Sequence, residues 1–184
     1  MADMPFPISY WVGPPTELSR YRELADCGFT IAAGPPEALD LAQEVGMQMV
    51  VQDQRLHVHL PQEPNWQETI QAIVYDYGTH PALYGYYITD EPHYRYFEPL
   101  AQVVRAFQLQ DADHLPYINL YPNYASPDQL GTIEYSTYVR RYMEIVRPPV
   151  LSYDHYALLE DGDRPGYFAN LEVIRQEALR AGVP

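Results

Sequence analysis

The sequence predicts an α/β fold, a partial parallel barrel assembled from strand–helix units. Apolar runs rich in β-formers alternate with amphipathic helical runs along all 184 residues. Glycines end several helical runs directly before the next apolar run, as at Gly28, Gly46 and Gly78. Hydrophobic residues make up 47% of the chain, enough to bury a core in one domain. Alternation without all-α or all-β blocks favours parallel strands joined by crossover helices.

The predicted elements follow one another in regular order. The first unit is a strand over residues 8–13 and a helix over 16–28, capped by Thr16. Residues 55–64 are a long loop or a short extra strand, and Asn65 caps the helix that follows. The remaining strands are predicted over 29–34, 47–53, 83–89, 116–121 and 150–156, and the remaining helices over 36–46, 65–77, 96–109, 133–146 and 168–181.

Two architectures fit six such units: a shortened eight-fold barrel and an open doubly wound sheet. The first predicted strand lacks the G-x-G-x-x-G turn that supports a dinucleotide-binding fold. We therefore expect a partial TIM barrel, (βα)6 of a (βα)8 barrel, forming a single domain over residues 1–184. A final glycine at Gly182 follows the last helical run and predicts a further strand, but the sequence ends at Pro184.

Composition excludes several classes of protein. The net charge of −14 argues against nucleic acid, whose phosphates require clustered positive charge. All eleven basic residues are arginines, which excludes Schiff-base, pyridoxal-phosphate and P-loop chemistry. The single cysteine, Cys27, excludes an internal disulfide and a thiolate-rich zinc site.

No apolar run approaches the 18 or so residues of a spanning helix, so we expect no membrane insertion. Residues 1–8 lack a charged segment followed by a long apolar one. We expect a soluble protein without a secretory signal in this chain, and its localisation stays open because a native signal could have been removed.

Polar and aromatic side chains gather at the carboxyl ends of the predicted strands, where parallel barrels carry their chemistry. Acidic and amide groups beside aromatic rings suit a neutral saccharide, and 18 tyrosines and 2 tryptophans supply the rings. The alternative is that the tyrosines only pack half-buried strands. The candidate ligand-binding residues are Tyr10, Trp11, Asp90, Asn119, Tyr121, Tyr153, His155 and Tyr156.

Glu91 is the strongest catalytic candidate. It follows an apolar strand directly and precedes Pro92, which fixes it at the mouth of the barrel. A carboxyl beside tyrosines and an ionised Asp90 has a raised pKa, as a general acid requires. The structural alternative is that Asp90 and Glu91 cap the next helix and pair with Arg95.

The stretch from Tyr86 to Pro92, YYITDEP, resembles the fourth-strand motif of the clan A TIM-barrel glycoside hydrolases, the retaining cellulase and β-galactosidase group. The resemblance implies that Glu91 is the acid/base. Asp90 replaces the usual asparagine, which contacts the sugar 2-hydroxyl in that family. The stretches 80–91, 116–124 and 150–156 are also similar to bacterial glycoside-hydrolase-like proteins. In the family the nucleophile is a glutamate at the end of strand seven, and the chain stops where that strand would begin.

Asp154, after the last predicted strand, is the candidate substitute base, with Asp53 behind it. Its strand and that of Glu91 are second neighbours, about 10 Å apart at roughly 4.8 Å per strand. Inward-leaning side chains would shorten this separation to the 6.5–9.5 Å or so of an inverting glycosidase.

Two other functions remain open. One is a non-catalytic carbohydrate-binding remnant that has lost its nucleophile. The other is a metal-dependent sugar isomerase or epimerase in which Glu91, Asp154 and His155 hold Mn²⁺ or Mg²⁺. His57 and His59 form a weaker candidate metal pair, for which a solvated loop is the favoured interpretation. Our leading hypothesis, a glycosidase, includes no cofactor and no metal.

A barrel without units seven and eight exposes two sheet edges and the apolar faces that those units would cover. We therefore expect self-association, most simply as a two-fold homodimer. A barrel closed by six strands, or a loop over residues 55–64 folded across the gap, would instead leave a monomer.

Overall fold

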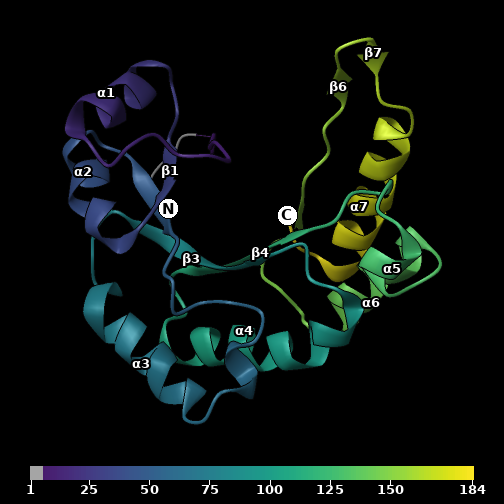
Figure 1. The fold of residues 1–184 in the computed structure, drawn as a ribbon. Coiled ribbons are helices and arrows are strands. Elements are labelled where there is room, and N and C mark those ends of the chain that lie inside the picture. The colour runs from purple at the N-terminus through teal and green to yellow at the C-terminus, as the bar shows by residue number, and fades with distance from the viewer. Residues whose placement is uncertain (1–5) are drawn as a thin grey trace.

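The computed structural model describes residues 6–184. In that part of the chain, five parallel strands form one curved sheet in the order β1-β2-β3-β4-β5. The helices cover its convex side, and the concave side faces an open hollow (Figure 1). The architecture is therefore an α/β half-barrel, which agrees with a partial barrel but not with six strand–helix units.

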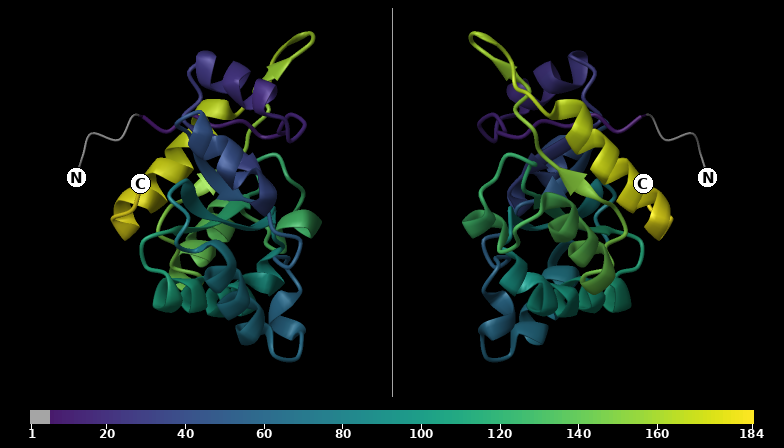
Figure 2. Two further views of the ribbon diagram at one scale, coloured as in Figure 1. Left: turned by 90° about the vertical axis from the view of Figure 1, so that its left-hand side faces the viewer. Right: turned by 90° about the vertical axis from the view of Figure 1, so that its right-hand side faces the viewer.

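The elements of the half-barrel run in chain order around the sheet. A separate antiparallel pair, β6 and β7, forms a hairpin that projects from the body of the molecule (Figure 2). The strands are β1 (Ile31–Gly34), β2 (Gln48–Val51), β3 (Leu83–Asp90), β4 (Leu115–Leu120), β5 (Ser152–Tyr153), β6 (Leu158–Leu159) and β7 (Gly162–Asp163). The helices are α1 (Leu18–Asp26), α2 (Leu39–Glu44), α3 (Trp66–Tyr77), α4 (Phe97–Gln110), α5 (Pro127–Leu130), α6 (Tyr135–Ile145) and α7 (Tyr167–Ala181), with short 3-10 turns at Pro36–Ala38, Leu60–Gln62 and Tyr94–Tyr96.

The predicted first strand, over residues 8–13, is wrong. The Ile8 carbonyl accepts hydrogen bonds from the backbone N–H groups of Thr30 and Ile31, both at 3.0 Å, but no strand forms there. Prolines flank the segment and remove the donors that a ladder requires. At Gly13 the segment passes so close to β1 that an added Cβ would lie 2.9 Å from the Ala33 carbonyl oxygen. The segment therefore lies against the start of the sheet without becoming its sixth strand.

Several local expectations also need correction. The first helix begins at Leu18, so Thr16 does not cap it. Asn65 stands at the N-cap of α3 but has a left-handed backbone and no side-chain capping bond. Gly28 and Gly46 have the expected positive φ of 88° and 75°, whereas Gly78 has a φ of −62° and is not a left-handed stop. Of the two alternatives for residues 55–64, the structure has the long loop, which contains a 3-10 turn, and not the short strand.

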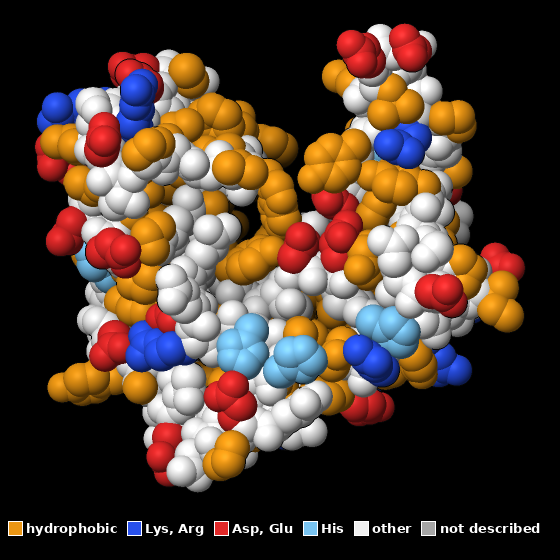
Figure 3. All heavy atoms as spheres, in the orientation of Figure 1, with side chains coloured by type: hydrophobic (Ala, Val, Ile, Leu, Met, Phe, Trp, Pro, Cys, Tyr) orange, Lys and Arg blue, Asp and Glu red, His pale blue; other side chains and the backbone are white. Residues whose placement is uncertain are grey.

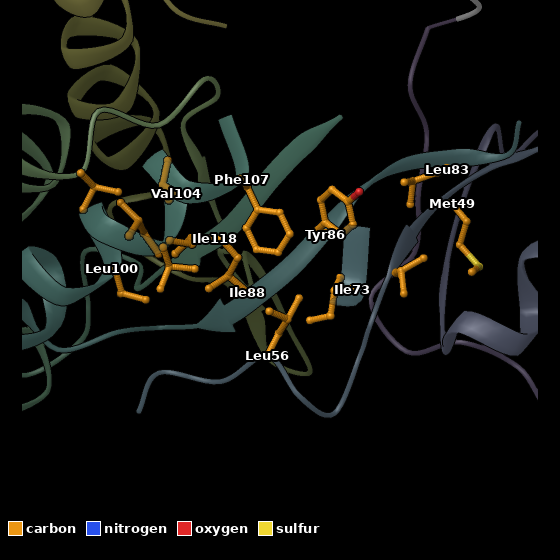
Figure 4. Close-up of a cluster of buried hydrophobic side chains, with 14 of the residues drawn as sticks. Met49, Leu56, Ile73, Leu83, Tyr86, Ile88, Leu100, Val104, Phe107 and Ile118 are labelled. Carbon is orange, nitrogen blue, oxygen red and sulfur yellow. The ribbon is translucent and has the colours of Figure 1, made fainter. Parts of the chain in front are cut away.

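The hydrophobic core lies between the convex face of the sheet and the helices. Tyr86 of β3 is fully buried and stacks on Phe107 of α4, with ring centroids 4.4 Å apart. Its hydroxyl donates a hydrogen bond to the Asp111 carboxylate beyond the end of that helix. Ile88 and Ile118 extend the same apolar layer along β3 and β4 (Figure 4). This layer fixes the sheet, and with it the direction in which each strand end points.

None of the helices in residues 6–184 is long and apolar enough to cross a membrane.

Phe107→Ala should destabilise the chain by about 3–5 kcal/mol, because it removes a fully buried ring that stacks on Tyr86. Leu109→Ala is the matched control, since Leu109 lies on the same helix and is 76% exposed. We expect the control to change the free energy of unfolding by no more than about 0.5 kcal/mol. Urea unfolding measures both, and equal losses for the two variants would contradict the placement of the core.

Candidate active site

Three carboxyl groups meet at the carboxyl edge of the sheet. Asp90 is the last residue of β3, Glu91 follows it, and Asp154 follows β5. Because β3, β4 and β5 are parallel, their carboxyl ends lie at one edge. Acidic side chains are visible in the hollow between the α1–α2 side of the molecule and the arm formed by α7 and the hairpin (Figure 3). The structure thus brings together both predicted catalytic residues and Asp90.

Asn119 of β4 ties the three strands together. Its side-chain amide donates to the Asp90 carboxylate at 3.1 Å, and its carbonyl accepts from the Ser152 hydroxyl at 3.0 Å. Ser152 in turn shares a 2.7 Å hydrogen bond with the Tyr117 hydroxyl. Asn119 is 1% exposed, so its amide positions the strand ends. The sequence suggested that Asn119 binds a ligand, but its buried amide is not free to do so.

The backbone of Glu91 is held in an unusual conformation. Its φ is 43°, in the left-handed region, which costs on the order of 1–3 kcal/mol for a residue with a side chain. The Glu91 N–H donates to the Asn119 carbonyl at 2.8 Å, and the buried Tyr138 hydroxyl donates to the Pro92 carbonyl at 2.8 Å. Bonds from β4 and α6 therefore hold the turn that aims the Glu91 side chain.

The Glu91 carboxyl is held in its protonated form up to neutral pH. Burial, the charges of Asp154 and Asp90, and the close approach of Asp154 together raise its pKa from 4.5 to about 7, with burial the largest cause. Glu91 forms no ion pair with an arginine in the described part of the chain, so no positive charge offsets these effects. The predicted pairing of Asp90 or Glu91 with Arg95 does not form either, since Arg95 bonds to Tyr96.

The two neighbouring aspartates share this environment. Burial and the charge of Asp90 raise the pKa of Asp154, while its hydrogen bond with Glu91 lowers it. Burial also raises the pKa of Asp90, against the lowering effect of its hydrogen bonds with Asn119 and the Glu91 backbone. Of the three carboxyls, Glu91 has its pKa raised to about 7, so it is the group that keeps a proton most readily.

Two of the predicted aromatic residues stand beside the carboxyls. The charges of Glu91 and Asp90 raise the pKa of Tyr121 after burial, and the charge of Asp154 is the main cause of a raised pKa at Tyr156. Tyr156 is 58% exposed, which suits a stacking surface.

The hairpin arm holds Tyr156 in place. Arg164 donates to the Tyr156 carbonyl at 3.1 Å and lies over the Tyr124 ring, 4.1 Å from its centroid. The Tyr124 hydroxyl accepts from the Tyr156 N–H at 3.3 Å. Asn170, fully buried at the start of α7, accepts from the backbone of Asn123 and anchors the arm to the loop after β4.

Tyr10 and Trp11 lie away from the carboxyls. They line a cavity of about 400 Å³ on the concave face of the sheet, together with Tyr87 and Tyr117. The sequence interpretation missed Tyr87 and Tyr117. Alternation along β3 and β4 was the available signal, because it directs one side chain in two to the concave face.

His155 lies close enough to Asp154 to lower the pKa of that carboxyl, but the side chains of Tyr153 and His155 pack against other residues. Burial and then the neighbouring Tyr167 raise the pKa of Tyr153, whose side chain packs against the core. The His155 ring stands between Tyr124 and Tyr167, with centroids 5.1 and 5.2 Å away. In residues 6–184 no group of three or more acidic, histidine or cysteine side chains is arranged to hold a metal ion, so the proposed metal set of Glu91, Asp154 and His155 does not fit.

The remaining sequence candidates have structural partners. Asp53 is 8% exposed and pairs with Arg55 at 2.7 Å while accepting from the Tyr77 hydroxyl at 3.0 Å. His57 lies 3.1 Å from Glu63, and His59 packs edge-on against Tyr96, so the two imidazoles do not converge.

Comparison with known proteins relates this fold to glycosidases. No protein-family model matches the chain, and no curated protein matches its sequence. Among solved structures, a glycosyl hydrolase family 2 member from Bacteroides cellulosilyticus is similar over 75% of this chain, with 14% identity and a TM-score of 0.53. An FMN-binding beta-glucuronidase from Facaelibacterium prausnitzii is similar over 89%, with 13% identity and a TM-score of 0.57.

A beta-glucuronidase from Bacteroides uniformis is similar over 91% of this chain, with 12% identity and a TM-score of 0.59. The chain spans only 18% of the B. cellulosilyticus protein, 26% of the F. prausnitzii protein and 22% of the B. uniformis protein. At this identity the likeness shows a shared glycoside-hydrolase-like fold.

Glu91→Gln should stabilise the chain relative to the unmodified protein as pH rises. The ordinary pKa of 4.5 is raised to about 7 in the folded state, so the folded form resists an ionisation that the unfolded form undergoes. The resulting loss of stability is absent below pH 4.5, grows as pH rises and is complete above pH 7. The variant lacks this loss, so its stability relative to the parent should increase over that range.

Urea unfolding at a series of pH values measures the difference, with Glu160→Gln on the exposed hairpin turn as the control. A difference that does not change with pH would contradict the raised pKa of Glu91.

Proposed function

We propose that this chain is a glycoside-hydrolase-type domain that binds a neutral saccharide in the hollow and donates a proton from Glu91 to a glycosidic oxygen. The observation that carries the proposal is the placement of Glu91 beside Asp90 and Asp154 at the carboxyl ends of parallel strands, a setting that raises the pKa of Glu91 to about 7. The glycoside-hydrolase-like fold and the motif around Glu91 support it.

In this proposal the other carboxyls keep Glu91 ready to donate its proton. The nearby charges of Asp154 and Asp90 oppose a second negative charge, so Glu91 keeps its proton near neutral pH. When the proton moves to the leaving oxygen, the same negative charges would stabilise positive charge that develops on the sugar ring. Tyr121 and Tyr156 would stack on the apolar face of the sugar.

The second candidate function is saccharide binding without hydrolysis, and the contact between Glu91 and Asp154 favours it. Inverting glycosidases separate their carboxyls by about 6.5–9.5 Å and retaining ones by about 5–5.5 Å. The effect of each of the Glu91 and Asp154 carboxyls on the pKa of the other indicates that they approach each other closely. Asp154 would act as the base only if a bound saccharide separated it from Glu91.

A panel of aryl and alkyl glycosides distinguishes these functions. If the chain is a glycosidase, Glu91→Gln should lower its activity by about 10²–10⁴-fold on substrates with poor leaving groups, because general acid catalysis contributes about that much. Glu160→Gln should have no effect. Binding of saccharides to the parent without turnover would favour the second function, and neither binding nor turnover would contradict both.

Activity should also fall as pH rises through about 7, because only protonated Glu91 donates. Asp154→Asn removes one of the charges that raise the pKa of Glu91, so the alkaline limb of the pH–rate profile should move to lower pH. Rates measured from pH 4 to 9 test this expectation. An alkaline limb at the same pH in the variant would contradict the coupling of the two carboxyls.

A further inference from the structure

The cavity on the concave face differs in chemistry from the carboxyl edge. It has a volume of about 400 Å³, within the range of small-molecule sites, and it is lined by uncharged residues alone. Leu115 and Val150 line it near the amino ends of β4 and β5, whereas Tyr87 lines it nearer the carboxyl ends. The cavity therefore extends along the concave face of the half-barrel, from near the carboxyl ends of the strands toward their amino ends.

Three aromatic rings form one wall of this cavity. The Trp11 and Tyr87 rings meet edge to face, with centroids 6.0 Å apart and planes at 70°. Tyr87 and Tyr117 lie 5.9 Å apart with planes at 32°. Trp11 remains 41% exposed, so its ring is accessible to a ligand. Such a wall favours an apolar or flat group, because most of the surface that the cavity exposes is apolar.

The cavity lies beside the carboxyl cluster, and two of its aromatic residues link the two. Tyr117, which lines the cavity, shares a hydrogen bond with Ser152. Ser152 bonds to Asn119, and Asn119 bonds to the Asp90 carboxylate at the carboxyl edge. Tyr87 is close enough to Asp90, Glu91 and Asp154 for their charges to raise its pKa, after the larger effect of burial. A single molecule could thus contact the acidic edge and the apolar cavity together.

We propose that the concave cavity binds the apolar aglycone of a glycoside whose sugar lies at the carboxyl edge, so the ligand is an amphiphilic alkyl or aryl glycoside. This inference rests on the proposed function. Burial of each methylene of such a tail strengthens binding about fourfold. The uncharged lining excludes a charged aglycone, since no described residue there would pair with it.

The alternative occupant of this face is a second copy of the chain, as in the homodimer predicted from the sequence. A two-fold interface through the concave face would bring Asp90, Glu91 and Asp154 toward their own copies in a chain of net charge −14. Like charges facing one another oppose that arrangement, whereas they do not oppose a neutral amphiphile.

The test uses Trp11 fluorescence in a Trp66→Phe background, which leaves Trp11 as the one tryptophan. Octyl β-glucoside and octyl β-galactoside, below their micellar concentrations, are titrated alongside the methyl glycosides and 1-octanol. We expect at least one octyl glycoside to bind at least tenfold more tightly than its methyl counterpart. Ala33→Leu, which adds side-chain atoms inside the cavity, should weaken octyl binding at least tenfold and leave methyl binding unchanged.

Ala181→Leu, an exposed position on α7, is the matched control and should change neither affinity. Trp11→Leu, measured by calorimetry, gives an independent reading if Ala33→Leu fails to fold, and it should also weaken octyl binding selectively. Equal affinities for octyl and methyl glycosides would overturn the inference and leave the proposed function standing. If 1-octanol binds and none of the glycosides binds, both the inference and the proposed function are overturned. A stable dimer in sedimentation that binds no octyl compound would assign the cavity to a second copy.

Discussion

The arrangement of the candidate site depends on one electrostatic constraint: three carboxyl groups share one edge of a parallel sheet without a neutralising cation among the described residues. Parallel pairing of β3, β4 and β5 puts Asp90, Glu91 and Asp154 at that edge. Negative charges this close cannot all form at little cost, so one group keeps its proton. Burial and the two neighbouring charges raise the pKa of Glu91 to about 7, so Glu91 is the group that keeps its proton.

The local backbone is built to maintain that constraint. The left-handed conformation of Glu91 is unfavourable, and two hydrogen bonds offset its cost: the Glu91 N–H donates to the Asn119 carbonyl, and the Tyr138 hydroxyl donates to the Pro92 carbonyl. Asn119 also joins Asp90 to Ser152 across β4, so a slip of one strand would break the chain of bonds. The strain at Glu91 is thus supported by the sheet, as is common at functional sites.

Much of this arrangement could be predicted from the sequence. Strand–helix alternation gave five of the six strands approximately, and the position of Glu91 after an apolar strand indicated a protonated acid. The strand over residues 8–13 could not be separated from a loop, because its apolar pattern is that of a strand and only flanking prolines oppose it. Asn119 and His155 also depend on tertiary context. The pairing of the strands places the Asn119 amide where it bonds to residues of both neighbouring strands. The fold of the arm places His155 between Tyr124 and Tyr167.

The central claim is that the Glu91 carboxyl keeps its proton to neutral pH. A carbon-13 NMR titration of the glutamate side-chain carboxyls, with Glu91→Gln used to assign the signal, measures this most directly. The structure predicts a midpoint at about 7 for Glu91, and a lower midpoint once Asp154 is replaced by asparagine. A midpoint near the ordinary value of 4.5, unchanged by that substitution, would contradict the account.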